Sequence, residues 1–236
     1  MNLILLFKDD FLNGTQRVRL TDRRHAHIRT VHRACVGDEL CIGICDGQIG
    51  KGRVIVLDDR HVEMDITLDR DAPGALPVTL VLALPRPLVC NRVLIAATSM
   101  GIKRLILFHC SRVEKSFWKS PVLKEENIKK QLVLGLEQAR DTILPHVQLR
   151  PLFKPFVEDE LPDIARQTMA LVAHPQAVEG CPCQVKGPVT LVIGPEGGLS
   201  PFELEKLTGV GFRPFHIGER ILRVESAIPA VLSKLF

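Results

Sequence analysis

The sequence predicts an α/β protein, in which a parallel sheet with covering helices follows a smaller N-terminal domain of antiparallel strands. From Val78 onward, wholly apolar runs of strand length alternate with helical patterns, whereas the segments before it alternate apolar and polar residues. Arg70–Pro77, which contains two prolines and a glycine, has the composition of a linker. We therefore expect two domains, at residues 1–72 and 73–236.

The region before the linker is predicted to form a small antiparallel β-barrel. Glu39–Ile44 and Gly52–Leu57 are short segments with the alternation of strands that have one buried face. Asp46-Gly47 lies between them and is a dipeptide typical of tight hairpin turns.

Strands and helices alternate after the linker. Val78–Leu84, Leu105–Phe108 and Met169–Ala173 are apolar runs of strand length. Between the first two, Val89–Met100 is predicted to be a helix that ends at Gly101. This order predicts a parallel sheet, because parallel strands need a crossover connection.

A long amphipathic helix is predicted over Glu125–Asp141. Apolar residues recur three and four positions apart along and just beyond it: Ile128, Leu132, Leu136, Ala139 and Ile143. Such a stripe is typical of a helix that faces a core.

Two strand-loop-helix units follow in succession near the C-terminus. Val189–Ile193 is an apolar, β-branched strand, and the loop Gly194–Gly198 follows it. Phe212–Ile217 is the next predicted strand, and Gly218 opens the next loop. Glycine lets the backbone approach a ligand closely, so the two loops indicate a ligand pocket. Neither loop is a common nucleotide-binding motif, because the G-x-G-x-x-G spacing and a P-loop lysine are absent.

The helix after the first loop has clear start signals. Ser200 is predicted to be its N-cap, because Pro201 suits the first helical position and Glu203 can close a capping box. We expect this helix to end around Gly209 or Gly211.

The last helix is expected to begin at Glu225 or Ser226 and to run through Leu235. Pro229 lies inside this range and has no backbone N–H. We therefore expect it within the first turn, where a helix tolerates proline.

The two loops resemble those of one enzyme family. Leu191-Val-Ile-Gly-Pro-Glu-Gly-Gly198 is similar to its L-I-G-P-E-G-G motif, and Ile217-Gly-Glu-Arg-Ile-Leu-Arg-Val-Glu-Ser226 is similar to its L-G-x-R-x-L-R-x-E-T motif. The family belongs to the SPOUT class of S-adenosylmethionine-dependent RNA methyltransferases and methylates N3 of a uridine in 16S ribosomal RNA. His174-Pro175 and Glu137-Gln138 match further family positions, and His27–Arg33 resembles part of the small barrel that such enzymes carry.

The resemblance implies a C-terminal SPOUT sheet with a deep trefoil knot, a PUA-like N-terminal barrel that binds RNA, and a homodimer. It implies S-adenosylmethionine as the cofactor, and direct methyl transfer needs no metal. The residues that match the cofactor-binding motifs are Ile193, Gly194, Pro195, Glu196, Gly197, Gly198, Ile217, Gly218, Ile221, Leu222 and Arg223.

Arg223 and Glu225 are the candidate catalytic residues. Uracil N3 is a weakly acidic imide nitrogen that must lose its proton before or during attack on the methyl group. A carboxylate can accept this proton, and a guanidinium can stabilise charge on the uracil oxygens. Arg220 and Glu196 are supporting candidates. The alternative is structural: Glu225 caps the last helix and pairs with Arg223.

Two basic stretches predict contacts with RNA phosphates. Residues 17–33 hold six arginines and three histidines against one aspartate, and residues 103–130 hold eight Lys and Arg against three glutamates. One such run alone is more often a solvated face, but two runs on either side of the linker favour an RNA that contacts both domains. The residues that we assign to RNA are Arg23, Arg24, His27, Arg29, Arg33 and Arg220.

The composition narrows the class of protein. Apolar residues make up 46% of the chain, which excludes a disordered protein, and the net charge is +4. No apolar run has the length of a membrane span, so we expect a cytoplasmic protein whose partner is the 16S RNA of the small ribosomal subunit. The seven cysteines lack a second suitably spaced ligand pair and fit reduced thiols better than a metal site.

Two other functions stay open at the level of sequence. One is a SPOUT methyltransferase that acts on another RNA or another atom of the base. The other is a non-catalytic RNA-binding protein of ribosome assembly, in which the basic stretches serve without a working cofactor pocket.

Overall fold

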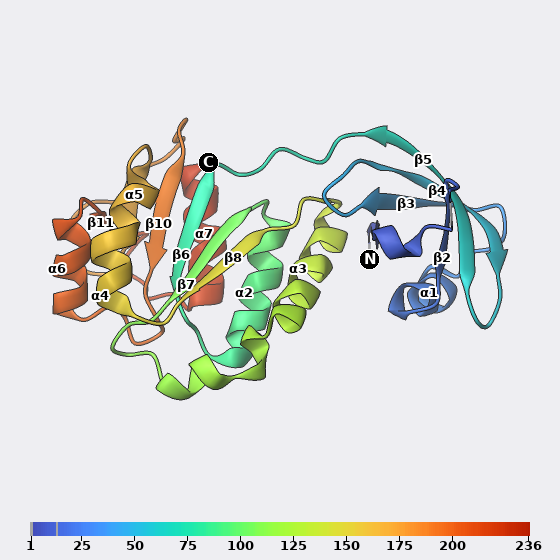
Figure 1. Ribbon diagram of the computed structural model, residues 1–236. Helices are drawn as coiled ribbons and strands as arrows, with labels where there is room; N and C mark the ends of the chain where they lie inside the picture. Colours follow the sequence, from blue (N-terminus) through green and yellow to red (C-terminus); the bar gives the residue numbers. More distant parts are fainter. Residues whose placement is uncertain (1, 13) are drawn as a thin grey trace. The chain divides into compact units, whose positions relative to one another are not determined.

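The computed structural model describes residues 2–12 and 14–236, which separate into two compact units (Figure 1). Unit 1 comprises the described residues up to Gly74 together with Val133–Leu144, and unit 2 comprises Ala75–Leu132 and Pro145–Phe236. The sequence analysis assigned everything after residue 72 to one domain. The contacts instead place Val133–Leu144 with the N-terminal residues.

Unit 1 contains a five-stranded sheet with the strand order β1-β3-β4-β5-β2. β1 pairs with β3 in parallel, and the other neighbours are antiparallel. The described edge strands β1 and β2 do not pair with each other, so the sheet is open where the sequence predicted a closed barrel. The strands are β1 (Ile4–Leu6), β2 (Arg17–Leu20), β3 (Glu39–Ile44), β4 (Ile49–Leu57) and β5 (Val62–Arg70).

β3 has its predicted bounds, but β4 begins at Ile49 instead of Gly52. Gly50 and Gly52 carry no side chain, so the alternation that marks a strand is not visible at its start. The pairing of Ile42 with Gly50 extends the ladder over these residues nonetheless.

The core of unit 1 lies on both faces of β1. Ile4 and Leu6 join one buried cluster, whereas Leu5 joins a second one together with Val133 and Leu136. Successive strand residues point to opposite faces, so a three-residue strand can serve both clusters. α3 (Glu125–Ala139) therefore contributes its first half to unit 2 and its second half to unit 1.

Unit 2 contains the predicted parallel sheet. All six strands are parallel, in the order β11-β9-β10-β6-β7-β8. Figure 1 shows α2 and α7, which pack together, on one side of the sheet and α4, α5 and α6 on the other. The strands are β6 (Val78–Ala83), β7 (Arg104–Phe108), β8 (His146–Arg150), β9 (Met169–Ala173), β10 (Val189–Ile193) and β11 (Arg213–Phe215). The helices are α2 (Pro87–Ser99), α4 (Phe153–Pro155), α5 (Leu161–Ala165), α6 (Pro201–Gly209) and α7 (Val224–Leu235).

Two helix starts differ from the predictions. α2 begins at Pro87, two residues before Val89, because proline suits the first helical position. α7 begins at Val224, so Pro229 lies in its second turn, and the prediction that it lies in the first turn is wrong. Pro229 offers no N–H to the Glu225 carbonyl. The predicted N-cap of α6 at Ser200 is confirmed.

The strand order reverses between β6 and β10. From β6 the chain adds β7 and β8 outward on one side, and the later strands lie on the other side. In parallel sheets, ligands bind outside the carboxyl ends of the strands at such a reversal. The loop after β10 lies at this reversal, and the loops after β9 and β11 leave the same carboxyl edge of the sheet beside it.

The described part of the chain has neither a candidate membrane-spanning helix nor a candidate metal-binding cluster. No helix there is long and apolar enough to cross a membrane. No group of three or more His, Cys, Asp or Glu side chains could hold a metal ion there. All seven cysteines lie within the described ranges and are free thiols.

Arg24 has a structural role, which corrects its assignment to RNA. It lies on α1 (Arg23–His27) and is only 5% exposed. Its guanidinium donates to both carboxylate oxygens of Asp10 at 2.7 Å, to Asp22 at 2.9 Å and to the Leu5 carbonyl at 2.7 Å. Burial alone would lower the pKa of Arg24, but the hydrogen bonds to Asp10 and Asp22 raise it. Few donors remain for a phosphate.

The segment after β7 carries the only tryptophan of the chain. Trp118 Nε1 donates to Nδ1 of His109 at 3.0 Å, and the two rings meet edge to face. Burial and the nearby charge of Lys115 lower the pKa of His109, although Glu203 opposes this. His109 must stay unprotonated at Nδ1 to accept this bond.

We predict that Arg24→Met lowers the free energy of unfolding by about 3 kcal/mol, because it removes a buried guanidinium that pairs with the largely buried Asp10 carboxylate and the Leu5 carbonyl. Arg29→Met is the matched control. Arg29 pairs with Asp59 at an exposed site, so its loss should cost less than about 1 kcal/mol. Urea denaturation of both variants measures the difference, and equal losses would contradict the structural role of Arg24.

We predict a pH-dependent change in the fluorescence of Trp118. Because folding lowers the pKa of His109 below its ordinary 6.5, the stability from the neutral ring is complete above that pH and is lost as the pH falls toward the lowered value. Tryptophan emission should therefore change with a midpoint below pH 6.5. His109→Asn should abolish the transition, and an unchanged transition in this variant would refute the assignment.

Candidate functional site

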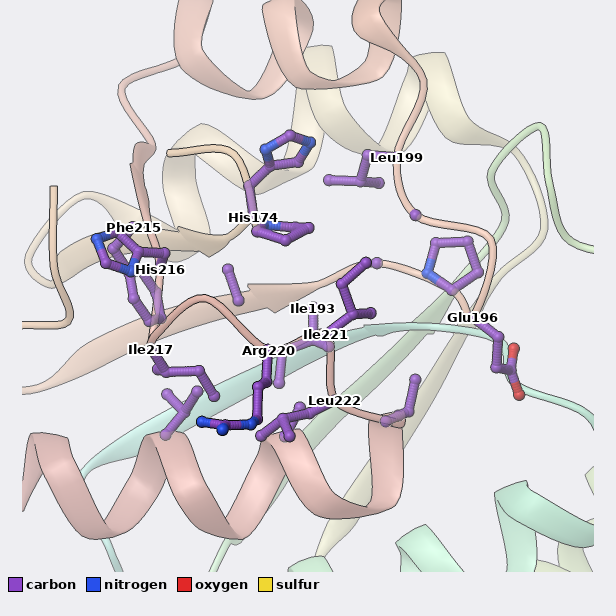
Figure 2. Close-up of a pocket in the computed structure, with 18 of the residues that line it drawn as sticks. His174, Ile193, Glu196, Leu199, Phe215, His216, Ile217, Arg220, Ile221 and Leu222 are labelled. Carbon is purple, nitrogen blue, oxygen red and sulfur yellow. The ribbon is translucent and has the colours of Figure 1, made fainter. Parts of the chain in front are cut away.

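A pocket of about 210 Å³ opens at the carboxyl edge of the parallel sheet (Figure 2). The ends of β9, β10 and β11, the loops that follow them and one face of α7 form its walls. The lining is mostly apolar side chains and backbone, which is typical of small-molecule sites.

The pocket gathers most of the predicted cofactor residues. Ten of the eleven line it, and the exception is Arg223. Arg220, which was assigned to RNA, lines it as well. The sequence pointed to His174-Pro175 only as a family match and did not assign it to the pocket, and the other lining residues were not predicted: Ala173, Leu199, Phe215, His216, Val224, Ala227 and Val231. The signal for the histidines was their position, because each directly follows a parallel strand.

The loop after β10 turns tightly and needs glycine at its start. A Cβ on Gly194 would lie 3.0 Å from Leu199 Cγ and 3.3 Å from its backbone nitrogen. The Gly198 N–H donates to the Pro195 carbonyl at 2.8 Å, which closes a turn. The loop ends at Ser200, the N-cap of α6. Its backbone therefore lies between a buried strand and a capped helix.

The loop after β11 is fixed by a histidine. The Gly218 N–H donates to Nδ1 of His216 at 3.1 Å, and Gly218 has a φ of 137°, in the region that favours glycine. The His174 N–H donates to the Phe215 carbonyl at 2.9 Å, which joins the end of β9 to the end of β11. Burial lowers the pKa of His174, because a buried site disfavours the charged imidazolium.

Glu225 and Arg223 lie at the start of α7, beside the pocket. Arg223 is the N-cap residue but makes no side-chain cap hydrogen bond. Glu225 lies in the first turn, and its half-buried carboxylate is 3.7 Å from Arg92 on α2. The ion pair of Glu225 is therefore with Arg92, a residue that the sequence analysis missed because α2 is distant in sequence.

Glu196 lies at the rim of the pocket. Figure 2 shows its carboxylate pointing away from the centre, and the Arg86 N–H lies 3.5 Å from one of its oxygens. Figure 2 also shows Arg220 beside the side of the pocket that α7 forms. Of the four residues considered for the chemistry, Arg220 and Glu196 line the pocket, and Glu225 and Arg223 do not.

Most arginines of the basic stretch at residues 17–33 already form ion pairs within the protein, so fewer are available for RNA than the composition indicates. Carboxylates from distant segments pair with Arg17, Arg19 and Arg29, and Arg23 donates to buried Glu137 at 2.9 Å. Burial raises the pKa of Glu137, and the charge of Arg23 opposes this.

Arg33 differs from these paired arginines. Arg33 forms no ion pair with a described residue and ends a helical turn in the left-handed conformation. His27 packs edge to face on His32, and burial lowers its pKa together with the charges of His32 and Arg23. Arg33 is thus the arginine of this stretch with most of its donors available.

Known proteins are similar to this chain over most of its length. Residues 72–236 match the RNA methyltransferase domain family. The ribosomal RNA small subunit methyltransferase E of Treponema pallidum is 27% identical over 232 residues, which cover 96% of this chain and 87% of that protein. The protein of the same name from Mycobacterium tuberculosis is 27% identical over 237 residues, covering 97% and 89%.

Solved structures share the fold over nearly the whole chain. The ribosomal RNA small subunit methyltransferase E of Neisseria gonorrhoeae bound to S-adenosylmethionine superposes with a TM-score of 0.75 and 19% identity, covering 98% of this chain and 95% of that one. A Legionella pneumophila protein in complex with the same cofactor gives a TM-score of 0.76 and 21% identity, covering 99% and 96%. The family match takes in all of unit 2 and well over half of the chain, so the protein belongs to the RNA methyltransferase domain family.

Proposed function

We propose that this protein is an S-adenosylmethionine-dependent methyltransferase that methylates N3 of a uridine in the 16S RNA of the small ribosomal subunit. The observation that carries the proposal is the pocket between the two glycine-bearing loops in a chain of this family. The names of the relatives support ribosomal RNA of the small subunit as the substrate. The choice of uridine N3 rests on the resemblance of the two loop motifs.

The residues of the pocket fit S-adenosylmethionine. Ile193, Ile217 and Leu222 offer apolar surface for a flat adenine, and the backbone around Gly194 and Gly218 offers donors and acceptors at close approach. When bound, the cofactor supplies an electrophilic methyl group on a sulfonium. The neighbours of this fold that were solved with S-adenosylmethionine support the assignment.

Charged residues near the start of α7 would act on the uracil base of the substrate. Glu225 is positioned to accept the proton of uracil N3, since its half-buried carboxylate lies in the first turn of α7 beside the pocket, 3.7 Å from Arg92. Arg223 and Arg220 would stabilise negative charge on the uracil oxygens. Glu196 would have a supporting role at the rim.

RNA would bind unit 1 through phosphate contacts. Arg33 offers a guanidinium without an ion pair to a described residue, and Arg23, His27 and Arg29 lie near it in the sequence. Arg29 would exchange an exposed carboxylate partner for phosphate, which costs little at a solvated pair. The open sheet of unit 1 would correspond to the PUA-like domain.

A second copy of the chain would cover apolar residues at α2 and α7. Leu88 is 74% exposed and Ile221 is 82% exposed, and Leu222 and Phe236 are exposed as well. These four residues lie at the start of α2 and near the two ends of α7, and those helices pack together. Exposed apolar residues that gather on packed elements are typical of an interface. We infer a homodimer, and we assign the trefoil knot of the SPOUT class to the C-terminal strands and loops.

The substrate is tested with small ribosomal subunits from a strain that lacks this protein. Incubation with the purified chain and S-adenosylmethionine should produce 3-methyluridine in 16S RNA, detected by nucleoside mass spectrometry. Methylation of another nucleoside would show that a different atom or RNA is the substrate. If no methyl group is transferred, the chain is a non-catalytic RNA-binding protein, and the proposal is wrong.

We predict that Glu225→Gln lowers turnover about 100-fold or more, because general-base catalysis contributes at least that factor. Its affinity for S-adenosylmethionine should stay unchanged, since Glu225 does not line the pocket. Glu219→Gln is the matched control, as Glu219 is an exposed carboxylate in the neighbouring loop. A single-turnover methylation assay measures the rate of methyl transfer. A wild-type rate in Glu225→Gln would contradict the catalytic role and leave Glu225 a structural one.

A further inference from the structure

The segment after β7 contacts the loop that follows β10 at its tip and, through Glu203 on α6, at its C-terminal end. The Ser111 N–H donates to Oε1 of Glu203 at 2.5 Å. Oε2 of the same carboxylate accepts from the N–H of Ser200 at 2.8 Å and from its hydroxyl at 2.9 Å. Because Glu203 is only 3% exposed, its carboxylate oxygens depend on these protein donors for the hydrogen bonds that water would otherwise supply. The C-terminal end of the loop is therefore tied to Ser111.

The next residue reaches the tip of the same loop. Nη1 of Arg112 donates to the carbonyl of Gly197. A Cβ on Gly197 would lie 3.2 Å from Cδ of Arg112 and 3.4 Å from its Cβ, so the aliphatic part of the arginine lies directly along the glycine. Nη1 is also the atom that a Cβ on Gly198 would meet, at 3.6 Å. One side chain thus holds two consecutive residues of the pocket wall.

Arg112 has no competing partner. It forms no ion pair with any residue in the described part of the chain, although it is exposed. The tip of the loop, Glu196 and Gly197, is exposed too, and its other contacts are the turn from Pro195 to Gly198 and the long contact of Glu196 with the Arg86 N–H at 3.5 Å. An exposed loop with few backbone hydrogen bonds opens at low free-energy cost, so an external contact at its tip matters for its order.

We propose that Arg112 is a positioning residue that holds the Gly197 carbonyl, and with it the loop Gly194–Leu199, in the conformation that binds S-adenosylmethionine. This inference rests on the proposed function, since it assumes that the pocket takes this cofactor. A loop that is already ordered loses less conformational entropy on binding, so the contact should increase affinity without touching the reacting atoms.

Calorimetry with S-adenosylmethionine on the full chain tests the proposal. Arg112→Met keeps the aliphatic stem and removes the donor, and we expect affinity about 5- to 10-fold weaker, the net effect of one solvent-exposed hydrogen bond. Arg112→Lys keeps a donor and should stay within about 3-fold of the wild type. Lys115→Met removes a neighbouring exposed charge and should leave the cofactor affinity unchanged.

Steady-state kinetics separate positioning from a general structural role. Arg112→Met should raise KM for S-adenosylmethionine by a similar factor, with kcat and the KM for RNA nearly unchanged. Its Tm should match the wild type, because Arg112 is an exposed surface residue. An equal loss of affinity in Lys115→Met, or a fall in kcat alone, would overturn the inference.

A double-mutant cycle with Gly197→Ala gives an independent test. The three nearest atoms to the added Cβ all belong to Arg112, so the substitution displaces that side chain. Its effect on cofactor affinity should therefore be smaller in the Arg112→Ala background, and additive effects would contradict the contact. If wild-type protein binds no S-adenosylmethionine, the proposed function fails; if it binds but Arg112→Met binds equally well, only this inference fails.

Discussion

The buried carboxylate of Glu203 is the interaction on which the candidate pocket depends. One oxygen accepts from the backbone after β7, and the other accepts from the residue that caps α6. An unpaired carboxylate at this depth would be costly, so the three groups hold one another in place. As a result, the loop after β10 starts from a fully buried strand and ends on a fixed helix. Only its tip projects, and Arg112 lies against that tip.

The wall and the edge of the pocket differ in chemistry. Its wall consists of apolar side chains and backbone, which suits a ligand recognised by shape and by main-chain hydrogen bonds. Charged groups lie at its edge, at Arg220 and at the pair of Arg92 and Glu225. Two histidines complete the wall: His216 accepts from the Gly218 N–H, and burial lowers the pKa of His174. This arrangement keeps formal charge away from the apolar wall and near the place where a base would enter.

Local signals in the sequence predicted the parts that depend on neighbours in the chain. An apolar β-branched run predicted β10, and the spacing of Ser200 and Glu203, three residues apart, predicted the N-cap of α6. Partners that are distant in sequence could not be predicted. The sequence predicted that Arg24 binds phosphate, but the structure pairs its guanidinium with Asp10. Arg23 pairs with Glu137, which is 114 residues away. The open edge of the unit 1 sheet has the same cause, because closure depends on long-range pairing that alternation does not specify.

The central claim is that the loops after β10 and β11 form one cofactor site. Amide hydrogen exchange of the full chain, with and without S-adenosylmethionine, tests it most directly, since bound ligand slows local opening. The account predicts added protection confined to Gly194–Leu199 and to His216–Leu222. Protection elsewhere in unit 2 with these two loops unchanged, or no change at a saturating cofactor concentration, would contradict it.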